Sequence, residues 1–275
     1  YLILVMCCSA SVSIVLRLSE EYSSNKFGVL TGNYLASVIL AFIALPDKNI
    51  IPSGGGKVAF IAGLINGAVF LSALLLLQIN IRKNGTVLAS TFAKLGMILP
   101  VILAIILLGE RPTITQIGGI LLVIVAILVI NMEKGEATVS FKIGLLLQMV
   151  VCGAADGMSK VFEQIGERQY DGLFVFYTFF FALLFSLVPL FLSKQKLKPI
   201  DLGGGIMVGI PNYFATWLLL VALTKLPAYL VYPSYSVGTI LVVSIISVFF
   251  LKDKMTRRQV YGCGLILAAL VVLNL

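Results

Sequence analysis

Two ionisable residues of opposite charge lie within long apolar stretches of the sequence. Lys94 is the only charged residue between residues 84 and 109, and Asp156 lies in the small-residue run 153–157. An ammonium can bind a carboxylate or a phosphate, and a carboxylate can bind an amine or a proton. A charged group among apolar residues costs free energy unless it is paired or reaches water. Lys94 and Asp156 are therefore the first candidates for a site that binds a small polar molecule.

Each of these charges also has a structural interpretation. The long stem of Lys94 could carry its ammonium to water, or the ammonium could belong to a structural ion pair. Lys160 follows Asp156 by four residues, so that both lie on one face of a helix and can neutralise each other. Lys160 itself is interpreted mainly as an anchor at the interface with water. Binding and structural interpretations both stay open for Lys94 and Asp156.

Aromatic and amide side chains near two prolines form a second group of candidates. Proline interrupts the hydrogen bonds of a helix and frees a carbonyl, so neighbouring polar side chains can line a cavity. Tyrosines spaced by three residues can stack a cation, although core packing or a belt at the membrane surface would explain them equally well. The candidate substrate-binding residues are Lys94, Asp156, Asn212, Tyr213, Trp217, Tyr232, Tyr235, Ser90 and Gln78.

The composition indicates the environment of these residues. The chain is 60% hydrophobic and 12% charged, with a mean hydropathy of +1.07, whereas soluble domains are about a quarter charged. Runs such as 101–108 show no two-residue alternation, which disfavours a β-barrel. An all-α polytopic membrane protein is therefore expected, because a helix of about 20 apolar residues crosses a bilayer. The ten expected spans are roughly 1–18, 28–45, 58–80, 85–108, 113–131, 141–162, 172–192, 202–223, 228–251 and 256–274.

The sequence contains an internal repeat with an offset of 143 residues. Glu110 aligns with Asp253, and Gln116 aligns with Gln259. The chain is therefore predicted to contain two five-span units, residues 1–133 and 141–275, joined by the polar linker 134–140. Because five is odd, the two units enter the membrane in opposite senses, and a substrate site is expected near the midplane where they meet.

Glycines four residues apart occur at corresponding places in the two units. Gly63 and Gly67 form one pair, and Gly205 and Gly209 form the other. Small residues at this spacing are typical of close contacts between membrane helices.

The end of the first unit resembles a known family. The pattern Pro100-x₇-Leu108-Gly109-Glu110-Arg111-Pro112-Thr113-x₂-Gln116-x₂-Gly119 is similar to the end of an EamA repeat, and the second unit ends in a weaker copy. Two such repeats in ten spans are characteristic of the drug/metabolite transporter superfamily. The resemblance implies a secondary transporter with alternating access between the two halves.

Several functions are compatible with this resemblance. Opposite charges on different helices suit a zwitterionic or anionic metabolite similar to an amino acid, exported by proton coupling or exchange. They equally suit a resting ion pair that a single ion breaks. The alternatives are a carrier that expels cationic drugs, and a membrane scaffold or lipid-handling subunit that transports nothing. An enzyme is not expected, because the sequence has no histidine, no paired intramembrane carboxylates and no Gly-x-Ser-x-Gly motif.

The sequence also indicates the expected partners, cofactors and cellular location of the protein. The partners are a small-molecule substrate, the lipid bilayer, protons and a second copy of the chain, but not nucleic acid, because the basic residues are scattered over short loops. No cofactor is expected, and a metal site is disfavoured by the absence of histidine. The chain is expected in the plasma membrane of a bacterium. Two indications of its orientation disagree. The distribution of lysine and arginine places both termini outside the cell, whereas the usual arrangement in the family places them inside.

Overall fold

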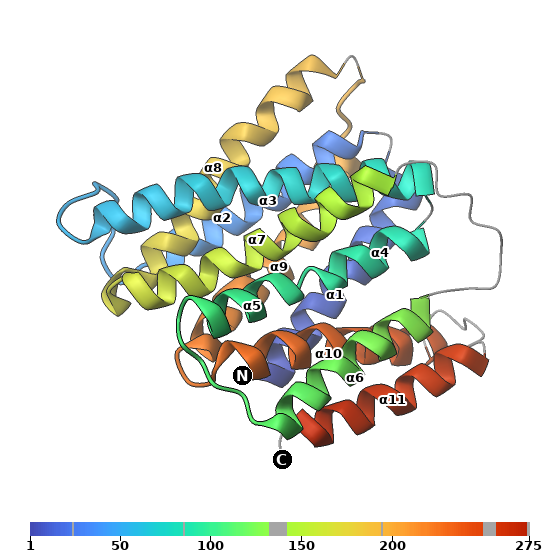
Figure 1. Ribbon diagram of the computed structural model, residues 1–275. Coiled ribbons are helices and arrows are strands. Elements are labelled where there is room, and N and C mark those ends of the chain that lie inside the picture. The colour runs from blue at the N-terminus through green and yellow to red at the C-terminus, as the bar shows by residue number, and fades with distance from the viewer. Residues whose placement is uncertain (24, 85, 132–141, 194, 250–256, 274–275) are drawn as a thin grey trace. The chain divides into compact units, whose positions relative to one another are not determined.

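The computed structural model describes residues 1–275 except 24, 85, 132–141, 194, 250–256 and 274–275 (Figure 1). The described residues form α-helices and one 3₁₀ turn, η1, and no β-strand occurs among them. The elements are α1 (Leu2–Tyr22), α2 (Lys26–Ala44), α3 (Gly56–Asn84), α4 (Thr86–Leu95), α5 (Ile98–Ile106), α6 (Ile114–Asn131), α7 (Lys142–Ile165), η1 (Arg168–Tyr170), α8 (Asp171–Leu192), α9 (Pro199–Leu223), α10 (Ala228–Phe249) and α11 (Arg257–Leu273).

These helices confirm the expected all-α polytopic membrane fold. Six of the described helical stretches are long and apolar enough to cross a membrane, and they comprise α2, α3, α7, α8, α9 and α10. Shorter apolar helices lie at the other four expected spans, and one of these stretches, residues 92–106, runs from α4 into α5. The linker predicted at 134–140 lies outside the described residues.

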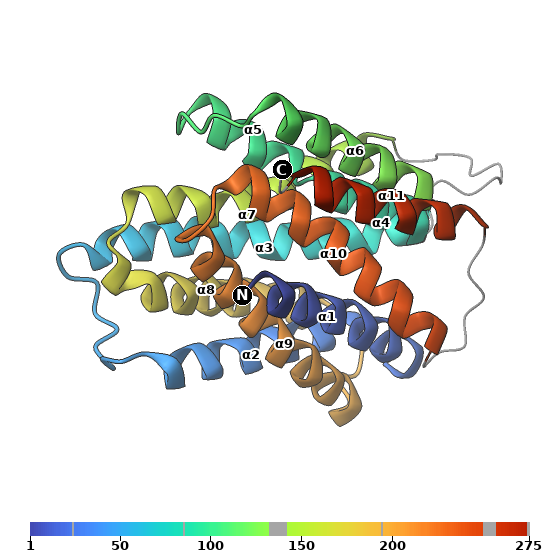
Figure 2. The same cartoon turned by 90° about the horizontal axis from the view of Figure 1, so that it is seen from below.

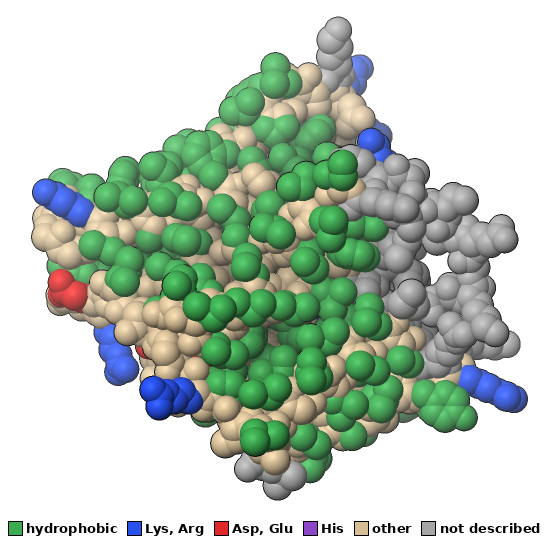
Figure 3. Space-filling view, in the orientation of Figure 1, with side chains coloured by type: hydrophobic (Ala, Val, Ile, Leu, Met, Phe, Trp, Pro, Cys, Tyr) green, Lys and Arg blue, Asp and Glu red, His purple; other side chains and the backbone are tan. Residues whose placement is uncertain are grey.

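Hydrophobic side chains are spread over the face drawn in Figure 3, and the few charged side chains seen there lie near its edges. Large apolar residues are exposed at helical spacing on several elements, for example Ile61 and Ile65 on α3 and Leu121 and Val125 on α6. Water would disfavour so much exposed apolar surface, whereas lipid accepts it.

The fourth expected span, residues 85–108, consists of two helices. Gly96 and Met97 form a turn between α4 and α5. Pro100 explains the break, because proline has no N–H to donate to the carbonyl four positions earlier, which is that of Gly96. The Leu99 N–H donates to this carbonyl instead, at 3.0 Å. Irregular backbone at membrane depth is tolerated where it is buried in protein or lines a water-filled path.

By its internal contacts the chain divides into two compact units, and the division falls within α3 and α7. The first unit contains residues 1, 3–71 and 161–222, and the second contains residues 2, 72–160 and 223–275. Each unit combines helices from both sequence repeats. Compact units and sequence repeats are therefore different divisions of the same chain.

Glycine contacts hold the helices of the first unit close together. A methyl group added at Gly205 of α9 would overlap the Val29 carbonyl oxygen of α2, and one at Gly63 of α3 would overlap Tyr177 of α8. The prediction that the glycine pairs mark close helix contacts is confirmed. α2 and α8 also pack along each other in this unit.

The second unit is built around α6, α10 and α11. α6 and α11 lie side by side in both ribbon views (Figures 1 and 2). A methyl group at Gly119 would lie 2.8 Å from Leu273 Cγ, which shows how closely they approach. α10 contacts α5, α6 and α11. This unit also contains α4 and the part of α7 up to Lys160, and with them both candidate charges.

Candidate functional site

Lys94 lies in the last turn of α4, directly before the break in the span. A cation in this position is stabilised by the partial negative charge of the helix C-terminus. The Lys94 ammonium lies over the Tyr235 ring of α10, 5.2 Å from the ring centre. An aromatic face attracts a cation through its quadrupole. Two of the predicted site residues, from the fourth and ninth spans, are therefore in contact.

α7 approaches the break at Gly153. A methyl group added at Gly153 would overlap the carbonyl oxygen of Gly96 and lie 2.8 Å from Leu99 Cβ. One turn further along α7, a methyl group at Gly157 would lie 3.8 Å from Pro100 Cβ, which is an ordinary contact. Glycine at position 153 therefore allows α7 to pack directly against the interrupted backbone.

Asp156 lies between these two glycines. Its carboxylate and the Lys94 ammonium are close enough to interact electrostatically. Among the described residues, however, no ion pair within 4.0 Å joins the two groups. Both side chains are half-buried. Opposite charges thus lie near each other without a direct ion pair.

Tyr232 connects α10 to α7 at the same level. Its hydroxyl donates a hydrogen bond of 2.7 Å to the backbone carbonyl of Asp156, and its side chain is fully buried. The candidate Tyr232 therefore positions Asp156 through the backbone.

A buried amide network holds α4 against α3 and α7. The Gln148 side chain donates to the Ala89 carbonyl at 2.8 Å, and the Asn80 side chain donates to Gln148 Oε1 at 2.8 Å. Asn80 also donates to the Gly144 carbonyl at 2.8 Å. Gln148 and Asn80 are both fully buried. Removing a partner from such a network leaves a buried polar group unsatisfied, so these bonds hold the short helix that carries Lys94 in position.

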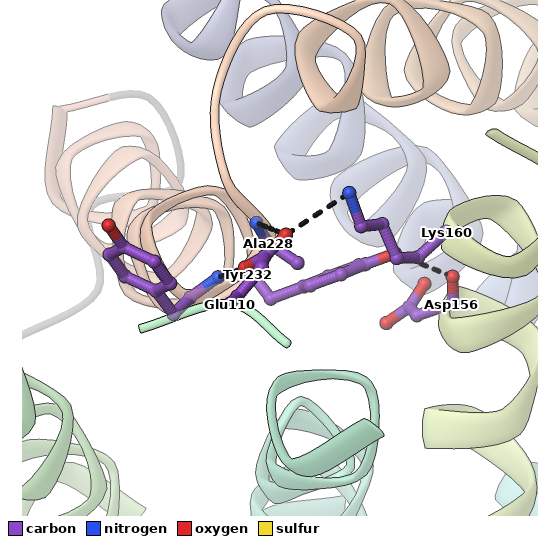
Figure 4. A network of polar contacts seen from close by, with 6 residues as sticks. Glu110, Asp156, Lys160, Ala228 and Tyr232 are labelled. Carbon is purple, nitrogen blue, oxygen red and sulfur yellow. Dashed lines mark hydrogen bonds and ion pairs between the residues drawn. The ribbon is translucent and has the colours of Figure 1, made fainter. Parts of the chain in front are cut away.

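A second charged cluster lies at the N-terminus of α10 (Figure 4). The Lys160 ammonium is 3.1 Å from Glu110 Oε1, and the two side chains are only 7% and 14% exposed. Glu110 accepts hydrogen bonds from the backbone N–H groups of Ala228 at 3.1 Å and Tyr229 at 3.3 Å. The interpretation of Lys160 as an interface anchor is wrong, because the side chain is buried and paired with Glu110.

Glu110 is the member of this cluster that sequence reasoning missed. The sequence shows it only as part of the repeat motif, because its partners lie far along the chain: Lys160 is 50 residues away, and Ala228 and Tyr229 are 118 and 119 residues away. One feature of the sequence is compatible with its position: the first turn of α10 has no acidic residue of its own. The structure adds that Gly109, directly before Glu110, has a positive φ of 70°, as in a chain leaving a helix.

The other predicted site residues are distributed differently. Asn212, Tyr213 and Trp217 lie on α9 in the first unit, where the Asn212 side chain donates to Asn33 Oδ1 at 3.1 Å. Tyr213 is buried and Trp217 is 37% exposed. Their part in substrate binding stays a prediction. The side chains of Gln78 and Ser90 lie outside the described part of the structure, and their predicted role also stays a prediction.

The comparisons with known proteins agree with this fold. The model of the EamA-like transporter family matches residues 1–132 and 143–275, which confirms the two-repeat architecture. An uncharacterised protein of Haemophilus influenzae is 22% identical over 286 residues, covering 99% of this chain and 96% of the relative. A crystal structure shares the fold with a TM-score of 0.77 at 12% identity, covering 98% of this chain and 93% of the other.

Proposed function

This chain belongs to the EamA-like transporter family of the drug/metabolite transporter superfamily and is a multi-pass membrane transporter, and we propose that its cargo is a small polar metabolite with a carboxylate. The substrate is zwitterionic or anionic and resembles an amino acid. It is exported by alternating access, driven by proton coupling or by exchange. The plasma membrane of a bacterium is the proposed location, in keeping with the relative from Haemophilus influenzae.

One observation carries the choice of substrate. Lys94 and Asp156 present opposite charges from α4 and α7 without a direct ion pair between them among the described residues. In this proposal the Lys94 ammonium binds the substrate carboxylate, and Asp156 binds the substrate amine where there is one. Charge-assisted hydrogen bonds of this kind are the strong ones. A purely cationic drug would be repelled by Lys94, which disfavours the drug-efflux alternative.

The interruption of the fourth span is consistent with a conformational change at the turn between α4 and α5, beside this site. Broken helices whose ends meet at the substrate are a recurrent feature of secondary transporters. α7 rests on the break at Gly153, so a change in the turn between α4 and α5 would reach Asp156 directly. Lys94 and Asp156 would then move relative to each other as the transporter changes state.

A ligand screen on the protein purified in detergent tests the proposed substrate class. The panel contains amino acids, carboxylates without an amine, amines without a carboxylate, and lipophilic cations. A ligand at a hundred times its Kd stabilises the folded state by about 2.7 kcal/mol, so binding raises the thermal unfolding midpoint. Amino acids or simple carboxylates should raise it, and amines and cations should not. Stabilisation by lipophilic cations alone would contradict the proposal.

A further inference from the structure

Four charged groups of alternating sign follow one another through the second unit. They run from Lys94 through Asp156 and Lys160 to Glu110. Lys94 interacts electrostatically with Asp156, Lys160 lies four residues after Asp156 on α7, and its ammonium is 3.1 Å from Glu110. Helical spacing thus places the candidate substrate site next to a second charged cluster.

Glu110 caps the first turn of α10 through hydrogen bonds. Its two carboxylate oxygens accept the N–H groups of Ala228 and Tyr229, where the helix dipole favours a negative charge. The oxygen that accepts from Ala228 is also the one that binds Lys160. Lys160 therefore joins α7 to the N-terminus of α10 through Glu110, in addition to the Tyr232 hydrogen bond between the same two helices.

The turn that Glu110 binds lies directly before a missing backbone hydrogen bond in α10. Pro233 is inside this helix, and it cannot donate a hydrogen bond to the carbonyl of Tyr229 four positions earlier. The first turn, from Ala228 to Tyr232, can therefore tilt relative to the rest of the helix. Tyr235, which contacts Lys94, lies just beyond the proline. Movement of this turn would change access to the candidate site.

Lys160 has a second carboxylate within reach. Residues four apart on a helix are neighbours on its surface, so Asp156 is placed to compete with Glu110 for the same ammonium. In a site with few polar groups such a competition is strong, because charges interact more strongly there than in water. The outcome of this competition depends on whether Asp156 already has a compensating cation, and Lys94 is the cation that interacts with it electrostatically.

We infer that Lys160 is a switch residue that couples the charge balance of the candidate site to the tie between α7 and α10. With Lys94 compensating Asp156, Lys160 stays with Glu110 and the first turn of α10 is held. When a carboxylate ligand that has no amine takes Lys94, Asp156 draws Lys160 away from Glu110, and the Tyr232 hydrogen bond is what remains of the tie between α7 and this turn. This last step rests on the proposed function, but the switch itself can be tested without any substrate.

A native cysteine provides the readout. Cys152 lies one turn before Asp156 on α7, half-buried, and interacts electrostatically with Lys94 and Asp156. In a protein with Cys7, Cys8 and Cys263 replaced by alanine, the rate at which a water-soluble maleimide labels Cys152 measures access to the site. Lys94→Met should label about fivefold faster, because Lys160 moves to Asp156 and the turn opens. Asp156→Asn should label about fivefold more slowly, because Lys160 stays with Glu110.

Each substitution also changes the reactivity of the Cys152 thiol directly, and this direct effect would change the labelling rate in the opposite direction to the switch. Removing a cation beside Cys152 disfavours the reactive thiolate, and removing a carboxylate favours it. The decisive controls are the same two substitutions made together with Lys160→Met, which should remove the dependence of access on both. Lys196→Met, at an exposed lysine, controls for the loss of a charge.

Two results would overturn the inference. One is labelling that follows the direct effects, slower in Lys94→Met and faster in Asp156→Asn. The other is a pair of expected changes that persist when Lys160 is methionine. Thermal unfolding of each variant, measured in parallel, identifies any that fails to fold, and the analogous Lys94→Gln and Asp156→Ser variants then take its place. A failed ligand screen with a confirmed switch would refute the substrate class alone.

Discussion

Replacing Lys94 with alanine should reduce uptake of a carboxylate substrate into proteoliposomes by about 10- to 100-fold, because hydrogen bonds to charged groups contribute ~1.5–3 kcal/mol. The substitution removes the ammonium that lies over Tyr235 and faces Asp156. It also removes an interior charge that has no ion-pair partner within 4.0 Å among the described residues. Folding should therefore survive, and the loss should appear in transport.

The controls for Lys94→Ala separate the site from general effects of charge. Lys196→Ala removes an exposed lysine outside the helices and should transport as the unchanged protein does. Gel filtration and thermal unfolding in detergent should show Lys94→Ala to be folded. Unchanged uptake by a folded Lys94→Ala protein would remove this residue from the substrate site.

Replacing Gly153 with alanine should lower the thermal unfolding midpoint by several degrees and weaken ligand binding. The added methyl group would overlap the Gly96 carbonyl oxygen, so α7 must separate from the break between α4 and α5. Forced overlaps of this kind typically cost about 1–3 kcal/mol of stability. Because backbone and not a flexible side chain is in the way, the expected cost is at the upper end of this range.

Gly157→Ala is the matched control on the same helix. A methyl group there would lie 3.8 Å from Pro100 Cβ and requires no movement. Alanine is a better helix former than glycine by about 0.8–1.0 kcal/mol, so helix propensity alone predicts that both variants are stabilised. Opposite shifts at the two positions would confirm the close packing at Gly153. Equal shifts would show that α7 does not press against the break.

Much of the fold could be predicted from the sequence. Apolar length marks where a chain crosses a membrane, and all ten expected spans have a counterpart among the described helices. Apolar length does not show whether a helix is continuous. The break in the fourth span depends on Pro100 and Gly96, which are both visible in the sequence, but only the structure shows that the helix stops there.

The candidate site was predictable in part. Lys94 and Asp156 stand out as isolated charges, and the structure brings them together with Tyr232 and Tyr235. Helical spacing could not decide the partner of Lys160. It permits a pair with Asp156, whereas the observed partner is Glu110, which comes from another part of the chain. Such long-range choices depend on tertiary packing, which local spacing does not encode.

The central claim is that Lys94 binds the carboxylate of the substrate, and a thermodynamic cycle tests it most directly. The ligand found in the screen and its methyl ester are each titrated calorimetrically into the unchanged protein and into Lys94→Ala. Esterification should weaken binding to the unchanged protein by about tenfold or more and have little further effect in Lys94→Ala, because the two changes remove the same interaction. An equal loss on esterification in both proteins would mean that Lys94 and the carboxylate act independently, and it would contradict the proposed site.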